Sequence, residues 1–463
     1  MTDATETTAT TEPTAPTLLR VLVARRHWQV YETFRHHYER AAATLAEREG
    51  DQRISKLTVS KRQFERWYGG ELKTRPYPDQ CRVLETMFGI PVDELLGPAP
   101  LSVEEPRSSV FTGVDGPWAD LGVGERERQV AMAARRAFRF SSSIEGSSVG
   151  AETLDQLGDE VRRIAAVYPQ LPLPTLLGDL VELQDTSFRF LEQGRIRPIQ
   201  ARELYMLAGM ASGMLAKASH DLGDPRSAMT QARTAYVCAE NADHPALRAW
   251  ARGLQSLITY WSGQPHEAAR YAALGTATAQ GLRGTTTVWL ACLAARAHAI
   301  LGDVEAAKAA AARAEDARSA LRLDDLDAYG GIMTFPTPRQ LYYTAEASVH
   351  LGDDHRAAET QALAAVRAYR EAQPEEWAFS DEAGAHTNLA LARVASDEVD
   401  GAADAVRPVL DLPVEQRNFG IVTSARRVHD ALCAPRFRGA RAALEVRSEI
   451  QEFSAFSTAA VLR

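Results

Sequence analysis

Residues 57–97 read LTVSKRQFERWYGGELKTRPYPDQCRVLETMFGIPVDELLG, and this stretch decides the fold of the N-terminal part of the chain. It predicts a helix that begins with a capping box, because the N-cap Ser60 is followed three residues later by Gln63. Phe64 and Trp67 are three residues apart, so they share one face of this helix. We expect that aromatic face to point into a hydrophobic core.

A second helix is predicted at about residues 79–88, after the glycine pair Gly69-Gly70 has ended the first. One face of the second helix is apolar, with residues at i, i+3 and i+7. These residues are Cys81, Leu84 and Phe88. The glycine at position 89 then ends the helix.

The first predicted helix combines a basic outer face with its aromatic back. Its outward side chains are Lys61, Arg62, Gln63 and Arg66. Such a helix suits the major groove of DNA, where Arg or Lys pairs with guanine and Gln with adenine. The alternative is a solvated face of an ordinary helical bundle, which most basic helices are. Periodicity alone leaves both interpretations open.

The same stretch resembles the second half of a lambda-repressor-like (XRE-type) helix-turn-helix domain. The resemblance covers roughly residues 27–97 and is carried by Ser60, Trp67, Gly69-Gly70, Pro76, Pro78 and the ending GIPVDELL at 89–96. Upstream, REGDQRISKL replaces a helix of the LAEKLG kind. The resemblance implies recognition-helix residues facing the major groove and loop residues holding phosphates. The expected DNA-contacting residues are Ser60, Lys61, Arg62, Gln63, Arg66, Lys73 and Arg75.

The charge of the chain is divided unevenly. The 463 residues carry a net charge of −9, yet residues 18–75 contain 13 Lys and Arg against seven Asp and Glu. A basic module on an acidic body suits a protein that presents one face to phosphate. An acidic body is also what solubility alone would favour, so the division supports DNA binding without requiring it.

A repeating pattern fills the C-terminal two-thirds of the chain. A helix ends at a turn and an Ala-rich helix follows, in DLGDPRSAMTQAR, WSGQPHEAARYAA, LGDVEAAKAAAARA, LGDDHRAAETQALAA and SDEVDGAADAVRPVL. The expected turn residues are Gly223, Gly263, Gly302, Gly352 and Asp397. Two helices and two turns fill such a repeat, and each hairpin must cover its neighbour's apolar face. This region, about residues 170–435, resembles a tetratricopeptide-like array; a generic α-bundle is the alternative.

Together the two regions resemble actinobacterial transcriptional regulators that join an XRE-type helix-turn-helix to a tetratricopeptide-like domain. The shared segments are RQF-RW at 62–67, GELKT at 70–74, and LRAW at 247–250 with YWSG at 260–263. The resemblance implies sequence-specific binding to double-stranded DNA. We further expect a homodimer on a pseudo-palindrome, because one such module rarely supplies enough specificity.

The array could also hold an effector: a peptide, a protein or a small molecule. The residues expected to face a ligand from the inner helices are Arg248, Gln255, Tyr260, Arg296, Tyr343 and Asn388. The alternative for the aromatic residues is packing between hairpins. A second hypothesis for the whole protein is a peptide- or protein-binding scaffold that does not bind DNA. Such a scaffold would not need Lys61, Arg62, Gln63 and Arg66 together.

The sequence contains no motif for phosphate cradling, dinucleotide binding, zinc proteolysis or a nucleophilic serine. We therefore expect no catalytic residue, no metal site and no cofactor. The four cysteines, Cys81, Cys238, Cys292 and Cys433, have no metal or disulfide spacing and are expected to be buried thiols. No apolar run is long enough to cross a membrane, and the Thr-rich start is no signal peptide. The expected location is the cytoplasm, at the nucleoid.

These observations predict an all-α protein with an N-terminal helix-turn-helix domain followed by a tetratricopeptide-like helical superhelix. The expected segments are a disordered tail at 1–17, the DNA-binding domain at 18–97, a linker with a helical segment at 98–152, the repeat domain at 153–435 and a C-terminal helix or tail at 436–463.

Overall fold

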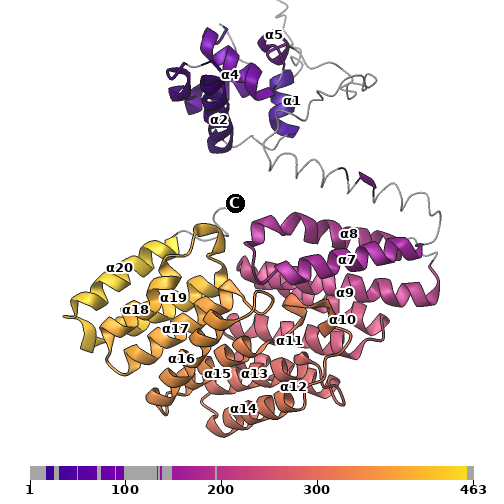
Figure 1. Ribbon diagram of the computed structural model, residues 1–463, viewed down its shortest axis with the longest axis vertical. Helices are drawn as coiled ribbons and strands as arrows, with labels where there is room; N and C mark the ends of the chain where they lie inside the picture. Colours follow the sequence, from indigo (N-terminus) through magenta and orange to yellow (C-terminus); the bar gives the residue numbers. More distant parts are fainter. Residues whose placement is uncertain are drawn as a thin grey trace, which may run out of the picture. The chain divides into compact units, whose positions relative to one another are not determined.

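The structure is a computed structural model, and every regular element that it describes is helical (Figure 1). It describes residues 17–25, 31–49, 51–69, 75–88, 90–97, 133, 136, 137, 149–192 and 196–455. No strand occurs among these residues, so the all-α prediction is confirmed for them. The expected tail, the loop containing Lys73 and almost all of the expected linker lie outside the described residues.

The chain divides into two compact units, Met1–Ala119 and Asp120–Arg463, called here the N-terminal and the C-terminal unit. The N-terminal unit contains α1 (Leu18–Arg25), α2 (Tyr31–Glu49), the 3-10 turn η1 (Ile54–Lys56), α3 (Lys61–Gly69), α4 (Pro78–Phe88) and α5 (Val92–Leu95). Both helices predicted between residues 57 and 97 are therefore present, as α3 and α4. The backbone N–H of Leu18 donates to Gly97 O at 3.0 Å, which joins the two ends of this bundle.

An aromatic core holds α3 against α2. Phe64 of α3 lies 4.6 Å from Phe34 of α2, measured between ring centroids, and Trp67 lies 6.1 Å from Tyr38. All four side chains are buried. The prediction that Phe64 and Trp67 face a core is confirmed, and the packing leaves the opposite side of α3 free to face solvent.

The C-terminal unit is a succession of helical hairpins. Its α-helices are α7 (Ala151–Val167), α8 (Leu177–Glu192), α9 (Pro198–Asp221), α10 (Pro225–Asn241), α11 (Pro245–Trp261), α12 (Pro265–Thr278), α13 (Thr285–Ile300), α14 (Val304–Ser319), α15 (Thr337–Leu351), α16 (His355–Glu371), α17 (Phe379–Ala395), α18 (Val399–Leu410), α19 (Phe419–Leu432) and α20 (Arg441–Ala455). Short 3-10 turns lie between them: η2 (Leu173–Thr175), η3 (Asp327–Tyr329), η4 (Gly331–Met333), η5 (Val414–Gln416) and η6 (Pro435–Phe437).

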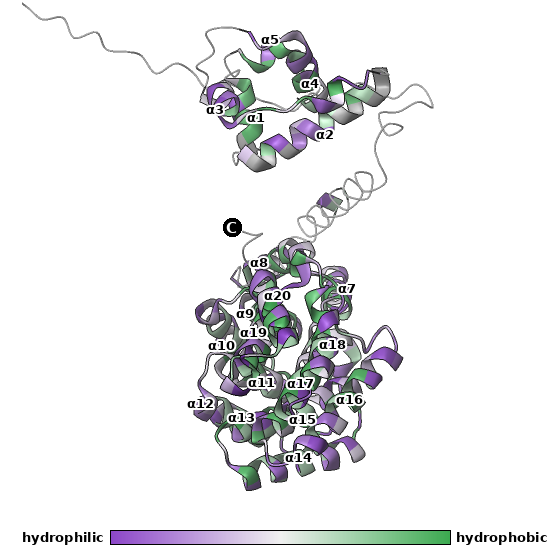
Figure 2. Ribbon diagram, turned by 90° about the vertical axis from the view of Figure 1, so that its left-hand side faces the viewer, coloured by the Kyte–Doolittle hydropathy of each residue, from purple (hydrophilic) through white to green (hydrophobic). Residues whose placement is uncertain are grey.

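The hairpins stack through their first helices. The helices α9, α11, α13, α15, α17 and α19 each contact the next one in this series, and each also packs against the helix that follows it in the chain. The first set therefore forms an inner layer and α10, α12, α14, α16, α18 and α20 an outer layer. Hydrophilic residues are frequent along outer helices such as α14 and α16 (Figure 2).

The outer helices bury alanine. In α10 the buried alanines are Ala228, Ala232, Ala235 and Ala239, a stripe at helical spacing, and α14 buries Ala307, Ala310 and Ala314 in the same way. Small side chains allow close approach of paired helices, because little volume separates the two backbones. The inner helix α13 is buried along nearly its whole length, from Thr285 to Ala299.

The predicted turn residues all have the left-handed backbone conformation. Gly223, Gly263, Gly302, Gly352 and Asp397 have φ values between 62° and 76°. Each follows the end of an inner helix, where glycine adopts this conformation without a Cβ clash. Among the described residues that were not predicted as turns, Asp243 after α10 has a φ of 53°, and Gly281, Gly330 and Gly331 also have positive φ values.

Two expectations from the sequence differ from the structure: the residue at which the repeat domain ends and the burial of the four thiols. The array continues past residue 435, because α20 packs on α18 and α19 and buries Val446, Ile450 and Phe453. The expectation of four buried thiols is wrong for Cys433, which is exposed just after α19, whereas Cys81, Cys238 and Cys292 are buried. No helix in the described part of the chain combines the length and the apolar character needed to span a membrane.

Candidate functional site

The N-terminus of α3 is fixed by the predicted capping box. The backbone N–H of Gln63 donates to Ser60 Oγ at 3.3 Å, and the backbone N–H of Ser60 donates to Gln63 Oε1 at 3.0 Å. The Ser60 hydroxyl also donates to Gln63 Oε1, at 3.0 Å. These bonds satisfy two backbone donors that a helix start would otherwise leave without partners.

The capping box changes the expectation for Gln63. Bidentate recognition of adenine needs both the oxygen and the nitrogen of a glutamine amide. In the structure the oxygen already accepts two hydrogen bonds from Ser60. Gln63 would therefore have to leave the box in order to read adenine, whereas its role in starting α3 is directly visible.

Three cations project from α3. Lys61, Arg62 and Arg66 are exposed, and none of their side chains forms a hydrogen bond or an ion pair with another described residue. Their helix is anchored on its other side by Phe64 and Trp67. A further anchor precedes it, because the Tyr31 hydroxyl of α2 donates to Val59 O at 2.9 Å. The result is a helix that is anchored on one side and carries, on the other, positive charge without a partner among the described residues.

Of the two phosphate-binding residues predicted after α3, the structure describes only one. Lys73 lies outside the described residues. Arg75 is exposed and forms an ion pair with Asp93 of α5, with 3.3 Å between Arg75 Nη2 and the carboxylate. An exposed pair of this kind is weak, so Arg75 can exchange Asp93 for another anion.

The C-terminal unit contains a cavity with two adjacent chambers that share part of their lining. The first, called the apolar chamber, encloses about 880 Å³, part of it open to solvent, and its walls include Trp250, Leu254, Trp289, Met333, Phe335 and Phe379. The second, called the polar chamber, encloses about 420 Å³ by the same measure and includes His220, Trp261, Arg296, Tyr342 and Ser424. The wall common to both is formed by Lys217, Asp221, Leu257, Tyr343, Ser380, Asp381 and Asn418.

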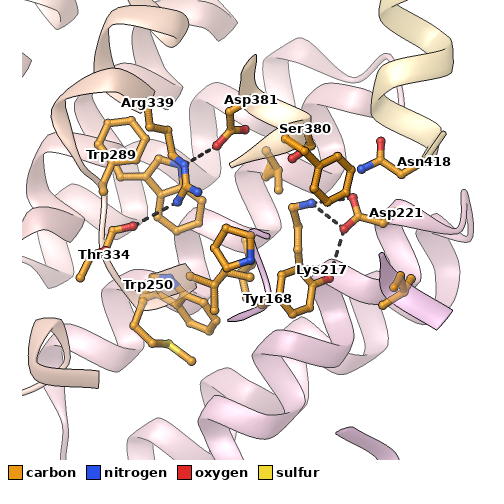
Figure 3. A pocket seen from close by; sticks show the side chains of 18 of the residues that line it. Tyr168, Lys217, Asp221, Trp250, Trp289, Thr334, Arg339, Ser380, Asp381 and Asn418 are labelled. Carbon is orange, nitrogen blue, oxygen red and sulfur yellow. Dashed lines mark hydrogen bonds and ion pairs between the residues drawn. The ribbon is translucent and has the colours of Figure 1, made fainter. Parts of the chain in front are cut away.

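Two ion pairs stand in the common wall (Figure 3). Lys217 Nζ lies 2.5 and 2.7 Å from the two carboxylate oxygens of Asp221, which also accepts a hydrogen bond from the Tyr168 hydroxyl at 3.1 Å. Across the chamber, Arg339 of α15 pairs with Asp381 of α17 at 2.5 Å. The paired groups are mostly buried, so each cation has its charge balanced locally.

Glycines on inner helices make room for the tryptophans of the apolar chamber. A Cβ on Gly213 of α9 would lie 2.1 Å from the Trp250 ring, and a Cβ on Gly253 of α11 would lie 2.5 Å from the Trp289 ring. Neither distance is physically allowed for a real side chain. The position of both indole rings therefore depends on glycine one helix away.

A buried ionic network lies next to the polar chamber. Glu346 of α15 accepts hydrogen bonds from Arg296 at 2.7 Å, from Arg427 at 2.9 Å and from the Tyr260 hydroxyl at 2.9 Å. Burial would raise the pKa of Glu346, but the charges of Arg296 and Arg427 outweigh it and lower that pKa to about 2. Burial lowers the pKa of His350 to about 4, so this histidine is neutral at pH 7.

Arg296 is bound incompletely by this network. Its side chain is 1% exposed, and its guanidinium lies 3.6 Å from the ring centroid of Tyr343 and 4.4 Å from that of Tyr260. One nitrogen, Nη1, reaches Glu346, but Nε and Nη2 have no hydrogen-bond partner among the described residues. Unpartnered buried N–H groups are rare and costly. The side chain lines the polar chamber.

The predicted ligand-facing residues divide into two groups. Arg296 and Tyr343 line the polar chamber, and the Tyr260 ring contacts Arg296 without lining either chamber. The other three lie away from both chambers: Arg248 is 3.9 Å from Asp243, Gln255 accepts from Arg252, and Asn388 donates to Tyr342 O. Trp250 and Trp289 pack between hairpins, as the alternative interpretation held, and at the same time they wall the apolar chamber.

Of the common wall, sequence reasoning predicted only Tyr343 and missed the other residues. Lys217 is one of five lysines in the chain, and its i,i+4 spacing to Asp221 was a visible signal. Arg339 and Asp381 gave no such signal, because they are 42 residues apart. Among the described residues, no group of three or more His, Cys, Asp or Glu side chains gathers in a way that could hold a metal ion.

No protein-family model matches this chain, and a search of curated proteins found no match either.

Proposed function

We propose that the protein is a sequence-specific DNA-binding transcriptional regulator, in which α3 reads the major groove and the helical array provides a dimer surface, an effector site or both. The observation that carries the proposal is the outer face of α3, where Lys61, Arg62 and Arg66 are exposed without partners among the described residues. A surface that served stability alone would gain from pairing these charges with acidic neighbours.

The helix has the features that groove binding requires. It is nine residues long, its first turn carries two of the cations, and it is held from behind by aromatic packing and by the Ser60–Gln63 box. Arg62 or Lys61 would contact guanine, and Arg66 would extend the contact along the groove. Arg75, after release from Asp93, would bind a backbone phosphate.

The arrangement also departs from a simple helix-turn-helix. Eleven residues, 50–60, separate α2 from α3, and they include η1. A three- or four-residue turn is the common length in that motif. We therefore propose a lambda-repressor-like module with a lengthened connection, in which Thr58 donates to Glu39 of α2 at 2.7 Å and so restrains the longer loop.

The experiment that tests the proposal is binding of the full-length protein to sheared genomic DNA from its source organism, followed by sequencing of the bound fragments. The Arg62→Ala/Arg66→Ala double variant is run beside it. The matched control is Arg313→Ala/Arg367→Ala, which removes two exposed arginines from α14 and α16 of the array. We expect a few enriched sites that share an inverted repeat, present with the control and lost with the α3 variant.

Uniform binding or none, with both variants indistinguishable from the unaltered protein, would contradict the proposal. It would favour the second candidate, a scaffold whose array binds a peptide or protein partner. The cavity of the C-terminal unit is the observation that keeps that candidate open.

A further inference from the structure

One side of the cavity in the C-terminal unit is bounded by contacts between distant parts of the array. The backbone N–H of Phe379, at the start of α17, donates to Pro169 O at 3.3 Å, and Gln170 Nε2 donates to Pro374 O at 2.6 Å. Gly331 lies so close to α7 that a Cβ there would be 1.9 Å from Ala165 O. Residues just after α7 thus bridge to the segment before α17, over the inner helices.

These bridges determine what size of molecule can enter. An extended peptide bound along the inner helices would need a continuous open groove. The contacts of Pro169 and Gln170 with the segment before α17 interrupt such a groove. The apolar chamber instead has the aromatic and aliphatic walls that are common in sites for small organic molecules.

The two chambers of the cavity differ in chemistry. Its apolar chamber presents Trp250, Trp289 and Phe335, which favour a flat or branched apolar body. Its other end presents Lys217 and Arg296, with polar Ser380 and Asn418 beside them. A ligand that fills both chambers must be apolar at one end and polar at the other.

Arg296 is incompletely compensated. It shares the carboxylate of Glu346 with Arg427, whereas Lys217 has Asp221 as its partner. Two of the Arg296 N–H groups, at Nε and Nη2, have no hydrogen-bond partner among the described residues. An oxyanion would supply the missing acceptor and would be attracted by the guanidinium charge.

We propose that this cavity binds a small amphipathic anion, with an apolar and preferably aromatic body in the apolar chamber and a single carboxylate or similar oxyanion facing Arg296 and Lys217. Its use as an effector rests on the proposed regulatory function, but binding itself does not. The bound molecule would also touch Tyr168, which follows α7 and hydrogen-bonds to Asp221. Occupancy would thereby tighten the bridge between α7 and α17.

The probe pair that tests the proposal is 8-anilinonaphthalene-1-sulfonate and N-phenyl-1-naphthylamine, which have nearly the same aromatic body with and without the anion. Each is titrated into the full chain in the absence of DNA, so the outcome is independent of the DNA-binding proposal. We expect saturable binding of the sulfonate at one site per chain. Energy transfer from tryptophan should accompany it, because Trp250 and Trp289 wall the chamber.

Two variants then test whether the cations at the polar chamber bind the anion of the probe. Lys217→Gln keeps a hydrogen bond to Asp221 and removes the charge, and Arg296→Lys keeps the charge but removes the unpartnered guanidinium N–H groups. We expect each to weaken sulfonate binding about tenfold or more, as for loss of a charge-assisted hydrogen bond. The neutral probe should change less than about twofold, within the scatter of uncharged contacts. If Arg296→Lys does not fold, the binding of the two probes to Lys217→Gln decides whether the site prefers an anion.

A third variant tests the location. Ser380 is partly exposed and lines both chambers, so Ser380→Leu should obstruct the passage and abolish binding of both probes. The matched control is Ser319→Leu, at the exposed end of α14. Sulfonate binding that survives Ser380→Leu would place the probe elsewhere and overturn the proposal. Equal losses of the two probes in Lys217→Gln would overturn the preference for an anion.

Discussion

The outer face of α3 and the cavity of the C-terminal unit use the same kinds of side chain in opposite ways. On α3, Lys61, Arg62 and Arg66 are exposed and have no partner among the described residues. In the array, Arg296 is 1% exposed and joined to a buried carboxylate. Exposed cations cost little to keep unpaired, whereas a buried cation must be compensated.

The contrast indicates which charged groups are functional in each unit. The exposed cations of α3 have no acidic partner among the described residues, and this indicates function. A polyanion such as DNA can bind them without any group having to leave a hydrophobic core. In the array the paired charges are first of all structural, and function is indicated only where pairing is incomplete, as at Nε and Nη2 of Arg296. Removing charges from α3 of the N-terminal unit should therefore weaken DNA binding. Removing paired charges from the C-terminal unit should lower its stability.

The largest expected effect is on the stability of the array. Glu346→Gln removes the one carboxylate that, among the described residues, pairs with both Arg296 and Arg427. We expect the free energy of unfolding to fall by about 3–5 kcal/mol, because the buried Arg296 and the partly buried Arg427 lose their compensation. Chemical denaturation of the C-terminal unit, followed by circular dichroism, measures this change.

Glu445→Gln is the control for Glu346→Gln, because it breaks the exposed Arg441–Glu445 pair of α20. Its melting temperature should equal that of the unaltered protein within error. If Glu346→Gln were as mild as this control, the buried network would not be structural and the contrast between the two units would fail.

Local features of the fold could be predicted from the sequence, and long-range pairings could not. The Ser60–Gln63 box, the aromatic face of α3 and the turn at Gly223 each depend on residues a few positions apart. Arg339 and Asp381 meet only because α15 packs beside α17 in one register. The closure of the cavity likewise depends on contacts between Pro169 and Phe379, which no sequence period indicates.

The second prediction concerns pH. Burial lowers the pKa of His350 to about 4, below the value near 6.5 of an unfolded chain. The unfolded state therefore binds the proton first as pH falls, so His350 makes the array lose stability between pH 6.5 and 4. The groups that face it are Tyr260, Glu346, Arg296 and Arg427. The loss should be about 3 kcal/mol at most.

The measurement for this second prediction is the free energy of unfolding at several pH values, for the unaltered chain and for His350→Gln. The variant does not titrate in this range, so its curve should be flatter between pH 6.5 and 4. His220, whose pKa is also lowered well below its usual value by burial, leaves a residual slope in both proteins. Parallel curves would show that His350 is not held neutral.

The third prediction addresses the support of α3. Ser60→Ala removes the hydroxyl that accepts from Gln63 N, and loss of such a cap costs about 1 kcal/mol. Hydrogen exchange of the α3 amides should become roughly fivefold faster, while exchange in the array stays unchanged. Ser55→Ala, which removes a hydroxyl of η1, is the control. Equal acceleration by both would mean that the box does not hold the helix start.

The smallest expected effect tests whether unpaired charge on the N-terminal unit is what DNA uses. Asp93→Asn frees Arg75, whose guanidinium lies 3.3 Å from that carboxylate. Affinity for random double-stranded DNA should rise by about two- to fivefold at low salt, because a surface pair is weak and one more cation becomes available. This gain in affinity should vanish as the salt concentration is raised. A plot of log affinity against log salt concentration should therefore be steeper for Asp93→Asn than for the unaltered protein. Asp397→Asn breaks a similar exposed pair, with Arg436, in the array, and it should leave DNA binding unchanged. An equal gain from both variants would mean that net charge, and not the surface around α3, governs the interaction.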